Sequence, residues 1–127
     1  MSCRWIPKAS VVGAHDKSLA AYGGGEGLRD DSMLESAPAR PENLAAYGDP
    51  AVYDLAAAYA YGIAKNHPFV DGNKRTAFLT AYLFLTLNGI QLTAPEHEAT
   101  AAVLALASGE LEESGFSEWL KANSEAL

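Results

Sequence analysis

The chain has 127 residues, of which 49% are hydrophobic, and this size and composition suit one domain, residues 1–127, with one core. Sixteen acidic residues against nine basic ones give a net charge of -7, which argues against nucleic-acid binding because that requires a basic surface. The single cysteine, Cys3, excludes an intramolecular disulfide, and no apolar stretch approaches the ~20 residues that cross a membrane, so we expect a cytoplasmic protein.

The first part of the chain predicts a helix that ends in glycines. Abundant alanine and few β-branched residues favour helix over strand throughout. The first helix is expected from about Pro7 or Ser10 to Tyr22, and Gly23-Gly24-Gly25 end it because ordering consecutive glycines is entropically costly. No Lys-Ser or Lys-Thr pair follows the glycines, which excludes a P-loop.

The segment from Leu28 to Pro50 has the least regular pattern in the chain. One short helix is predicted around Ser32 to Ala37, and the remainder is interrupted by Pro38, Pro41, Gly48 and Pro50. Long irregular segments inside compact domains are often functional flaps, and a plain surface connection is the equal alternative.

Asp49-Pro50 predicts the start of the next helix, since aspartate caps a helix well and proline fits its first turn. The residues that follow at the spacing of one buried helix face are Val52, Leu55, Ala56, Tyr59 and Ile63. We expect this helix to end near Asn66, because Pro68 disfavours helical geometry at His67.

A further helix is predicted to begin around Gly72 to Lys74 and to end at Leu87, before Asn88-Gly89. Its side chains are apolar almost all round, which is typical of a central helix surrounded by others. Thr93-Ala94-Pro95-Glu96 resembles a capping box and predicts a helix to Ser108-Gly109, and a last helix spans about Ser114 to Asn123. The sequence therefore predicts an all-α bundle of five to seven helices.

The stretch HPFVDGNKRTAFL, residues 67–79, concentrates polar groups where the central helix begins. Unpaired N–H groups and the aligned peptide dipoles make a helix N-terminus attractive to anions. Gly72 allows close approach of a ligand to the backbone, while Lys74 and Arg75 add two positive charges, Arg75 as a planar fork that suits phosphate oxygens. Together these residues predict a polyphosphate pocket.

The residues just before this helix add acid and base chemistry. Asp71 can bind Mg²⁺ beside phosphates, and the neutral ring of His67 can accept the proton of an attacking hydroxyl. Asn73 either binds phosphate or holds the loop through hydrogen bonds to its backbone. Taken singly, each residue also has a structural explanation, as a surface histidine, a turn, a cap or a solvated charge. Their order in one short segment favours the functional interpretation.

HPFVDGNKRTA resembles the signature of the Fic family (filamentation induced by cAMP), which is His-Pro-Phe-x-Asp/Glu-Gly-Asn-Gly-Arg-x-x-Arg. The chain departs from it at Lys74, where most Fic proteins have glycine, and at Phe78, where they have the second arginine. The Lys-Arg-Thr variant, the small size and the stretches GLRDDSMLESAPARPENL and YAYGIAKNHPF are similar to the death-on-curing (Doc) toxins of type II toxin–antitoxin systems. The resemblance extends from about Trp5 to Leu120 and implies a compact Fic fold.

Most Fic proteins transfer AMP to a protein hydroxyl, whereas Doc toxins bind ATP in the reversed orientation and transfer its γ-phosphate. The resemblance therefore implies a kinase toxin that uses ATP and Mg²⁺, modifies a threonine of elongation factor Tu and arrests translation. It implies His67 as the base, Asp71 as the Mg²⁺ ligand and four phosphate ligands, Gly72, Asn73, Lys74 and Arg75. Lys65, just outside the motif, is a weaker addition to this set.

In Fic proteins the segment equivalent to Gly27–Pro50 registers the target peptide as an extra strand. The resemblance thus implies a short irregular or β flap, whose edge we place at Leu44 to Tyr47. We find no counterpart of the autoinhibitory Ser/Thr-x-x-x-Glu-Gly/Asn helix of many Fic proteins, so the expected inhibitor is a separate Phd-like antitoxin that binds as a helix.

Two other functions remain open, an AMP transferase of the usual Fic type and a catalytically silent nucleotide-binding module. An intact His67 and Asp71 argue against the silent module. A metal hydrolase is disfavoured, since His15, His67 and His97 lack a ligand spacing such as i, i+4 on one helix. We expect His15 on a helix face and His97 on the surface.

Overall fold

The computed structural model describes residues 3–127, which form six helices and two short strands. The helices are α1 (Lys8–Tyr22), α2 (Asp31–Tyr47), α3 (Val52–Asn66), α4 (Asn73–Leu87), α5 (Glu96–Ser108) and α6 (Glu113–Ala122). The strands β1 (Ile90–Leu92) and β2 (Ser124–Ala126) pair antiparallel, with Gln91 opposite Glu125. The predicted all-α bundle is confirmed, whereas the small sheet was not predicted.

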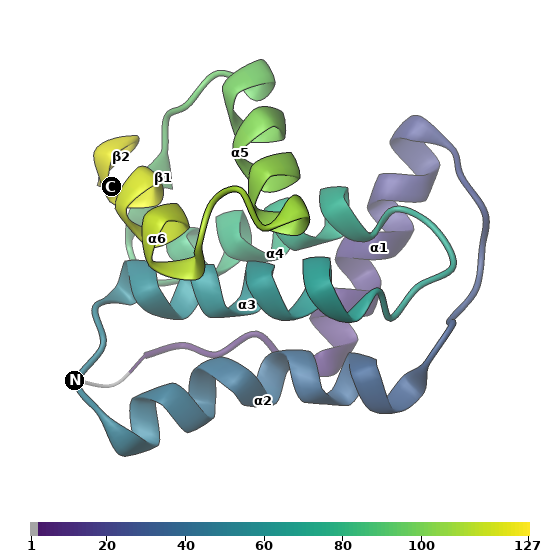
Figure 1. Ribbon diagram of the computed structural model, residues 1–127, viewed down its shortest axis with the longest axis horizontal. Coiled ribbons are helices and arrows are strands. Elements are labelled where there is room, and N and C mark those ends of the chain that lie inside the picture. The colour runs from purple at the N-terminus through teal and green to yellow at the C-terminus, as the bar shows by residue number, and fades with distance from the viewer. Residues whose placement is uncertain (1–2) are drawn as a thin grey trace.

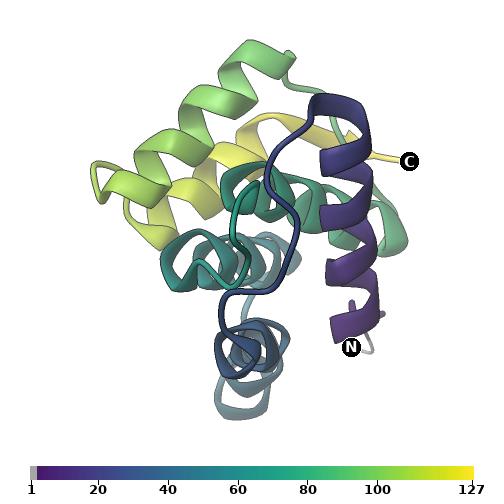
Figure 2. The ribbon, with the colours of Figure 1, turned by 90° about the vertical axis from the view of Figure 1, so that its right-hand side faces the viewer.

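Helix α3 lies at the centre of the bundle, between α2 on one side and α4, α5 and α6 on the other (Figure 1). Helix α1 stands across one end and packs on α4, as the turned view shows (Figure 2). The middle of α3 is completely buried from Ala56 to Ala60. In α4, by contrast, Leu83 and Leu87 are 36% and 43% exposed, so α3 and not the predicted α4 is the surrounded helix.

The segment expected to be largely irregular is mostly helix α2, which continues through Pro38 and Pro41. Each proline removes one backbone hydrogen bond, but both side chains are buried, and packing against α3 compensates for the loss. The two helices approach closely, because a Cβ added to Gly62 would lie only 3.3 Å from the Cα of Ala37.

The flap edge predicted at Leu44 to Tyr47 is wrong, since these residues form the last turn of α2. The irregular segment that does exist is shorter and lies between α1 and α2, where Leu28 makes an isolated antiparallel bridge with Phe69. Within residues 3–127, no helix is both long enough and apolar enough to cross a membrane.

Two predicted helix starts shift because other side chains provide the contacts. Helix α3 begins after Asp49-Pro50, where the carboxylate of Asp54 accepts a hydrogen bond from the Ala51 N–H at 2.9 Å. The capping box predicted at Thr93 is absent, since the Thr93 hydroxyl donates to the carbonyl of Asn123 at 2.9 Å. Thr93 therefore joins the end of β1 to the end of α6.

Tyr59 of α3 fixes the segment that precedes α1. Its hydroxyl accepts a hydrogen bond from the Ile6 N–H at 2.8 Å and donates to the Ile6 carbonyl at 3.2 Å. The residue is fully buried, and desolvation raises the pKa of the Tyr59 phenol to about 12. Its ring also packs on Phe84 of α4, with ring centroids 5.1 Å apart. One side chain therefore connects the N-terminal segment to the core of α3 and α4.

Replacement of Tyr59 by phenylalanine is expected to lower the free energy of unfolding by ~1–3 kcal/mol, because two buried backbone groups of Ile6 lose their partner. Urea denaturation followed by circular dichroism measures the change. The matched control is Tyr53→Phe, since Tyr53 is half-buried and its hydroxyl has no hydrogen bond within the described residues. Equal unfolding midpoints for the two variants would contradict the role of Tyr59.

Candidate functional site

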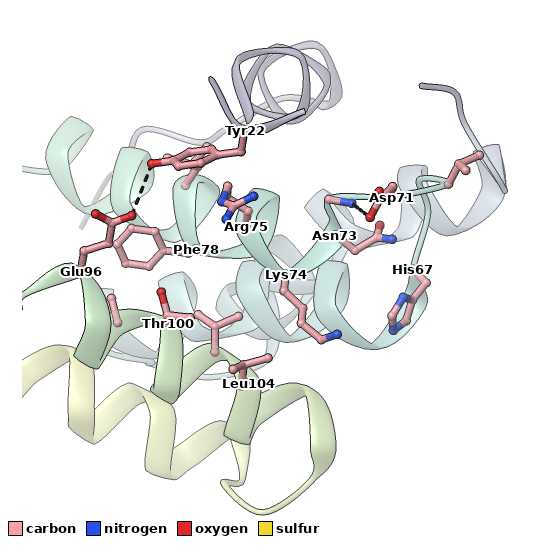
Figure 3. Close-up of a pocket in the computed structure, with 15 residues that line it drawn as sticks. Tyr22, His67, Asp71, Asn73, Lys74, Arg75, Phe78, Glu96, Thr100 and Leu104 are labelled. Atoms are coloured by element: carbon pink, nitrogen blue, oxygen red, sulfur yellow. Dashed lines mark hydrogen bonds between the residues drawn. The ribbon is translucent and has the colours of Figure 1, made fainter. Parts of the chain in front are cut away.

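A pocket of about 500 Å³ lies where the first half of α4 faces α5 and the end of α1 (Figure 3). One part of its lining is apolar, formed by Phe78, Leu79, Ala99, Val103 and Leu104. All six predicted site residues also line it, namely His67, Asp71, Gly72, Asn73, Lys74 and Arg75. Its volume lies in the range of ligand pockets in proteins, ~300–1,000 Å³.

The start of α4 forms the cationic side of the pocket. The first intrahelical hydrogen bond runs from the Thr76 N–H to the Gly72 carbonyl at 3.0 Å, so the N–H groups of residues 73–75 have no acceptor within the helix. Lys74 and Arg75 are exposed, and neither forms an ion pair with a carboxylate in the described part of the chain. Two uncompensated charges thus add to the positive end of the helix dipole.

The Asp71 carboxylate holds two loops together at the mouth of this helix. Its oxygens accept hydrogen bonds from the Gly72 N–H at 2.8 Å and from the Gly25 N–H at 3.2 Å. These bonds, first the one from Gly25, lower the pKa of the Asp71 carboxyl below its ordinary value. An exposed, ionised carboxylate is a ligand that suits Mg²⁺ beside phosphate oxygens, so the residue fits that ion.

Gly72 and Asn73, both predicted as phosphate ligands, make hydrogen bonds within the protein. The Gly72 N–H donates to Asp71, which leaves residues 73–75 as the backbone donors for an anion. The buried side chain of Asn73 accepts from the Phe69 N–H at 3.0 Å and donates to the Phe69 carbonyl at 2.9 Å. Of the two roles left open for Asn73, the structure therefore supports loop holding.

Arg75 lies against an aromatic ring of another helix. Its guanidinium carbon is 3.8 Å from the ring centroid of Tyr22, which is a cation–π distance. The Tyr22 hydroxyl in turn donates to the carboxylate of Glu96 at 3.3 Å, at the start of α5 (Figure 3). The sequence predicts Tyr22 only as the last residue of the first helix, and its place in the pocket depends on long-range packing.

His67 follows the last residue of α3 and has a left-handed backbone, with φ 48° and ψ 57°. It is the one non-glycine residue with positive φ among residues 3–127, and this geometry costs about 1 kcal/mol or more. The exposed ring makes no hydrogen bond within the described chain, so its nitrogens are accessible for proton transfer. A strained, exposed histidine on a pocket wall fits a catalytic base.

The sequence interpretation missed how His15 of α1 supports the loop. His15 is buried, its Nε2–H donates to the Asp71 carbonyl at 2.7 Å, and its ring stacks on Phe69 with centroids 3.8 Å apart. The sequence predicts only that His15 lies on a helix face. His97 is exposed, as predicted.

Lys65 does not line the pocket. Its ammonium donates to the Ala107 carbonyl at 3.0 Å, near the C-terminal end of α5. A lysine there caps a helix end, where the dipole favours a cation. The structure therefore places Lys65 outside the group of residues at the start of α4.

Comparison with known proteins adds an independent result. A match to the Fic/DOC family covers residues 5–85. "Toxin Doc" of Mycolicibacterium smegmatis is 47% identical over 77 residues, which are 58% of this chain and 58% of that protein, so this match spans less than two thirds of the relative. "Protein kinase doc" of Escherichia phage P1 is 33% identical over 119 residues, which are 93% of this chain and 94% of that protein.

Replacement of Asp71 by asparagine is expected to release one of the two loop amides, because an amide side chain has one acceptor oxygen where the carboxylate has two. Hydrogen exchange measured by NMR should show lost protection at Gly25 or Gly72 and unchanged protection inside α4. Asp16→Asn is the control, since Asp16 is exposed on α1 and has no hydrogen bond among the described residues.

Acid should have a related effect on the unaltered protein. The folded-state pKa of Asp71 is depressed, so the contact contributes fully above the ordinary value of 3.8 and disappears as the pH falls through the lower folded value. Equal protection of Gly25 and Gly72 in the asparagine variant and the unaltered protein would contradict the bridging role of the carboxylate.

Proposed function

The chain belongs to the Fic/Doc family, and on that premise we propose that it is a Doc-type toxin with protein kinase activity. The observation that carries the proposal is that an accessible His67 and the cationic first turn of α4 line the same pocket. A relative named as a protein kinase, aligned over 93% of this chain, supports the same conclusion.

In the proposed reaction a hydroxyl of the target protein attacks the γ-phosphorus of ATP. His67 accepts the hydroxyl proton as the new oxygen–phosphorus bond forms. The bond between the γ-phosphorus and the β,γ-bridging oxygen breaks, and ADP leaves. The ring of His67 is free to take this part because no hydrogen bond within residues 3–127 occupies it.

The start of α4 would bind the phosphates of ATP. The free N–H groups of residues 73–75 and the side chains of Lys74 and Arg75 can neutralise phosphate charge. Asp71 would hold Mg²⁺, which supplies further charge neutralisation when bound. The apolar lining offers a surface for the nucleobase, since Phe78 and Leu104 both belong to it.

Two residues favour transfer of the γ-phosphate over transfer of AMP. Lys74 occupies the place of a glycine that leaves room for the β-phosphate in the usual Fic proteins. Phe78 replaces an arginine that clamps the γ-phosphate in the AMP-transfer orientation, and its half-buried ring instead packs near Tyr82, with centroids 6.1 Å apart. The AMP-transfer geometry would therefore lack two of its supports.

The proposal includes the identity of the partners. A threonine of elongation factor Tu is the accepting hydroxyl, arrest of translation is the consequence, and a Phd-like antitoxin is the inhibitor in the cytoplasm. The target and the arrest of translation depend on the family resemblance alone, whereas a relative named Toxin Doc supports an antitoxin partner.

Incubation with elongation factor Tu and ATP labelled at the α- or γ-phosphate tests the reaction. We expect label on the target from the γ position only, and His67→Ala should lower the rate at least about 100-fold because the base is lost. His97→Ala, on the exposed face of α5, is the control and should keep the rate of the unaltered protein. Label from the α position alone would establish an AMP transferase instead, and no label from either position would favour a silent module.

A double substitution tests the choice of phosphate. Lys74→Gly with Phe78→Arg restores the usual Fic pattern, so γ-label transfer should fall and α-label transfer should rise. The ratio of the two labels on the target is the measurement. Leu83→Arg is the control, because Leu83 is an exposed residue of the same helix that does not line the pocket. An unchanged ratio in the double variant would show that these two positions do not select the phosphate.

A further inference from the structure

Three consecutive carbonyls at the end of α3 accept hydrogen bonds from one short segment that precedes α2. The guanidinium of Arg29 donates from Nη2 to the Asn66 carbonyl at 2.6 Å and from Nε to the His67 carbonyl at 2.5 Å. The backbone N–H groups of Arg29 and Asp30 donate to the Pro68 carbonyl at 2.7 and 3.0 Å. Residues 29 and 30 therefore hold the backbone on both sides of the His67 side chain.

These hydrogen bonds satisfy carbonyls that the end of α3 at His67 would otherwise leave without partners. A helix end leaves carbonyls without partners, and Pro68 prevents the chain from continuing as a right-handed helix. His67 adopts the left-handed geometry that glycine or asparagine usually takes at such an end. Arg29 presents two N–H donors along one rigid edge, so it can bridge the two adjacent carbonyls that this geometry exposes.

Arg29 itself projects from a well-anchored segment. The Asp30 carboxylate caps α2 by accepting a hydrogen bond from the Met33 N–H at 3.1 Å, and it also accepts from the Ser32 hydroxyl at 2.6 Å. The neighbouring Gly27 carbonyl accepts from the Val70 N–H at 3.0 Å. The guanidinium is therefore held at its backbone end as well as at its two acceptors.

The rest of the loop is held by other residues. Asn73 binds both backbone groups of Phe69, and His15 binds the carbonyl of Asp71. Arg29 does not line the pocket, so its side chain would not contact a nucleotide bound there. Loss of its side chain would leave the Asn66 and His67 carbonyls without these donors, while the backbone hydrogen bonds to the Pro68 carbonyl and the phosphate-binding end of the loop would remain.

We propose that Arg29 is a positioning residue, which holds His67 in its left-handed conformation and so directs the imidazole into the pocket. The part that concerns turnover rests on the proposed kinase function, while the part that concerns the backbone of His67 does not. Arg29 acts on the reaction through His67 alone.

The test compares Arg29→Ala and Arg29→Lys with the unaltered protein. NMR coupling constants and chemical shifts of His67 should report the left-handed backbone in the unaltered protein and its loss in Arg29→Ala. In Arg29→Ala we expect kcat for phosphate transfer to fall roughly tenfold or more, because the position of the His67 ring is disturbed. KM for ATP should stay within about twofold of the unaltered value, because the residues that bind the nucleotide are unchanged. Arg29→Lys should recover little of the lost kcat, since an ammonium lacks the two-donor edge.

Chemical rescue gives a second test. Added ethylguanidinium at millimolar concentration should restore part of kcat in Arg29→Ala and none in His67→Ala.

Arg40→Ala is the matched control, because Arg40 is a surface arginine of α2 that pairs with Glu113 and does not line the pocket. A left-handed His67 in Arg29→Ala, or an altered His67 with unchanged kcat, would overturn the proposal. If Arg29→Ala fails to fold by circular dichroism, Arg29→Gln, which keeps one donor group, takes its place with the same expected outcomes. If the unaltered protein transfers no phosphate, the proposed function fails, and the NMR comparison still decides whether Arg29 sets the backbone of His67.

Discussion

A loop without regular secondary structure must find partners for its backbone polar groups elsewhere in the molecule, and the segment from His67 to Gly72 depends on this requirement. Helices α1 and α4 and the segment before α2 all contribute donors or acceptors to it. The contributing residues are His15, Gly27, Arg29, Asp30 and Asn73. Because the loop carries both the proposed base and the proposed metal ligand, the chemistry of the site depends on contacts made far from the reacting atoms.

Different elements, each held in place by the core, supply the different chemical groups that line the pocket. The end of α3 presents a histidine ring, the start of α4 presents N–H groups and cations, and α5 with the end of α1 closes the apolar side. This concentration of positive charge lies in a chain whose formal net charge is -7. The local arrangement and not the total charge therefore makes the start of α4 attractive to anions.

Local signals in the sequence predicted where the loop that carries His67 and Asp71 begins and ends. Pro68 placed the end of α3 correctly, and the change from polar to apolar residues after Gly72 placed the start of α4. Pro38 and Pro41 predict an interruption of the helix because each removes a backbone hydrogen bond, but packing against α3 outweighs the two missing bonds. His15 and Arg29 reach the loop across 56 and 38 residues of sequence, and no local pattern reports contacts of that kind.

The close approach of α2 and α3 at Gly62 and Ala37 has a consequence for how the protein tolerates mutation. Helix α3 ends at the residue before His67, and it packs on α4, whose first turn is the cationic wall of the pocket. A methyl group added at Gly62 would lie 3.3 Å from the Ala37 backbone, so α2 would have to move by a few tenths of an ångström to admit it. A shift of ~1 Å between reacting groups can cost on the order of 100-fold in rate. A substitution at Gly62, which does not line the pocket, can therefore leave the protein folded and still lower turnover.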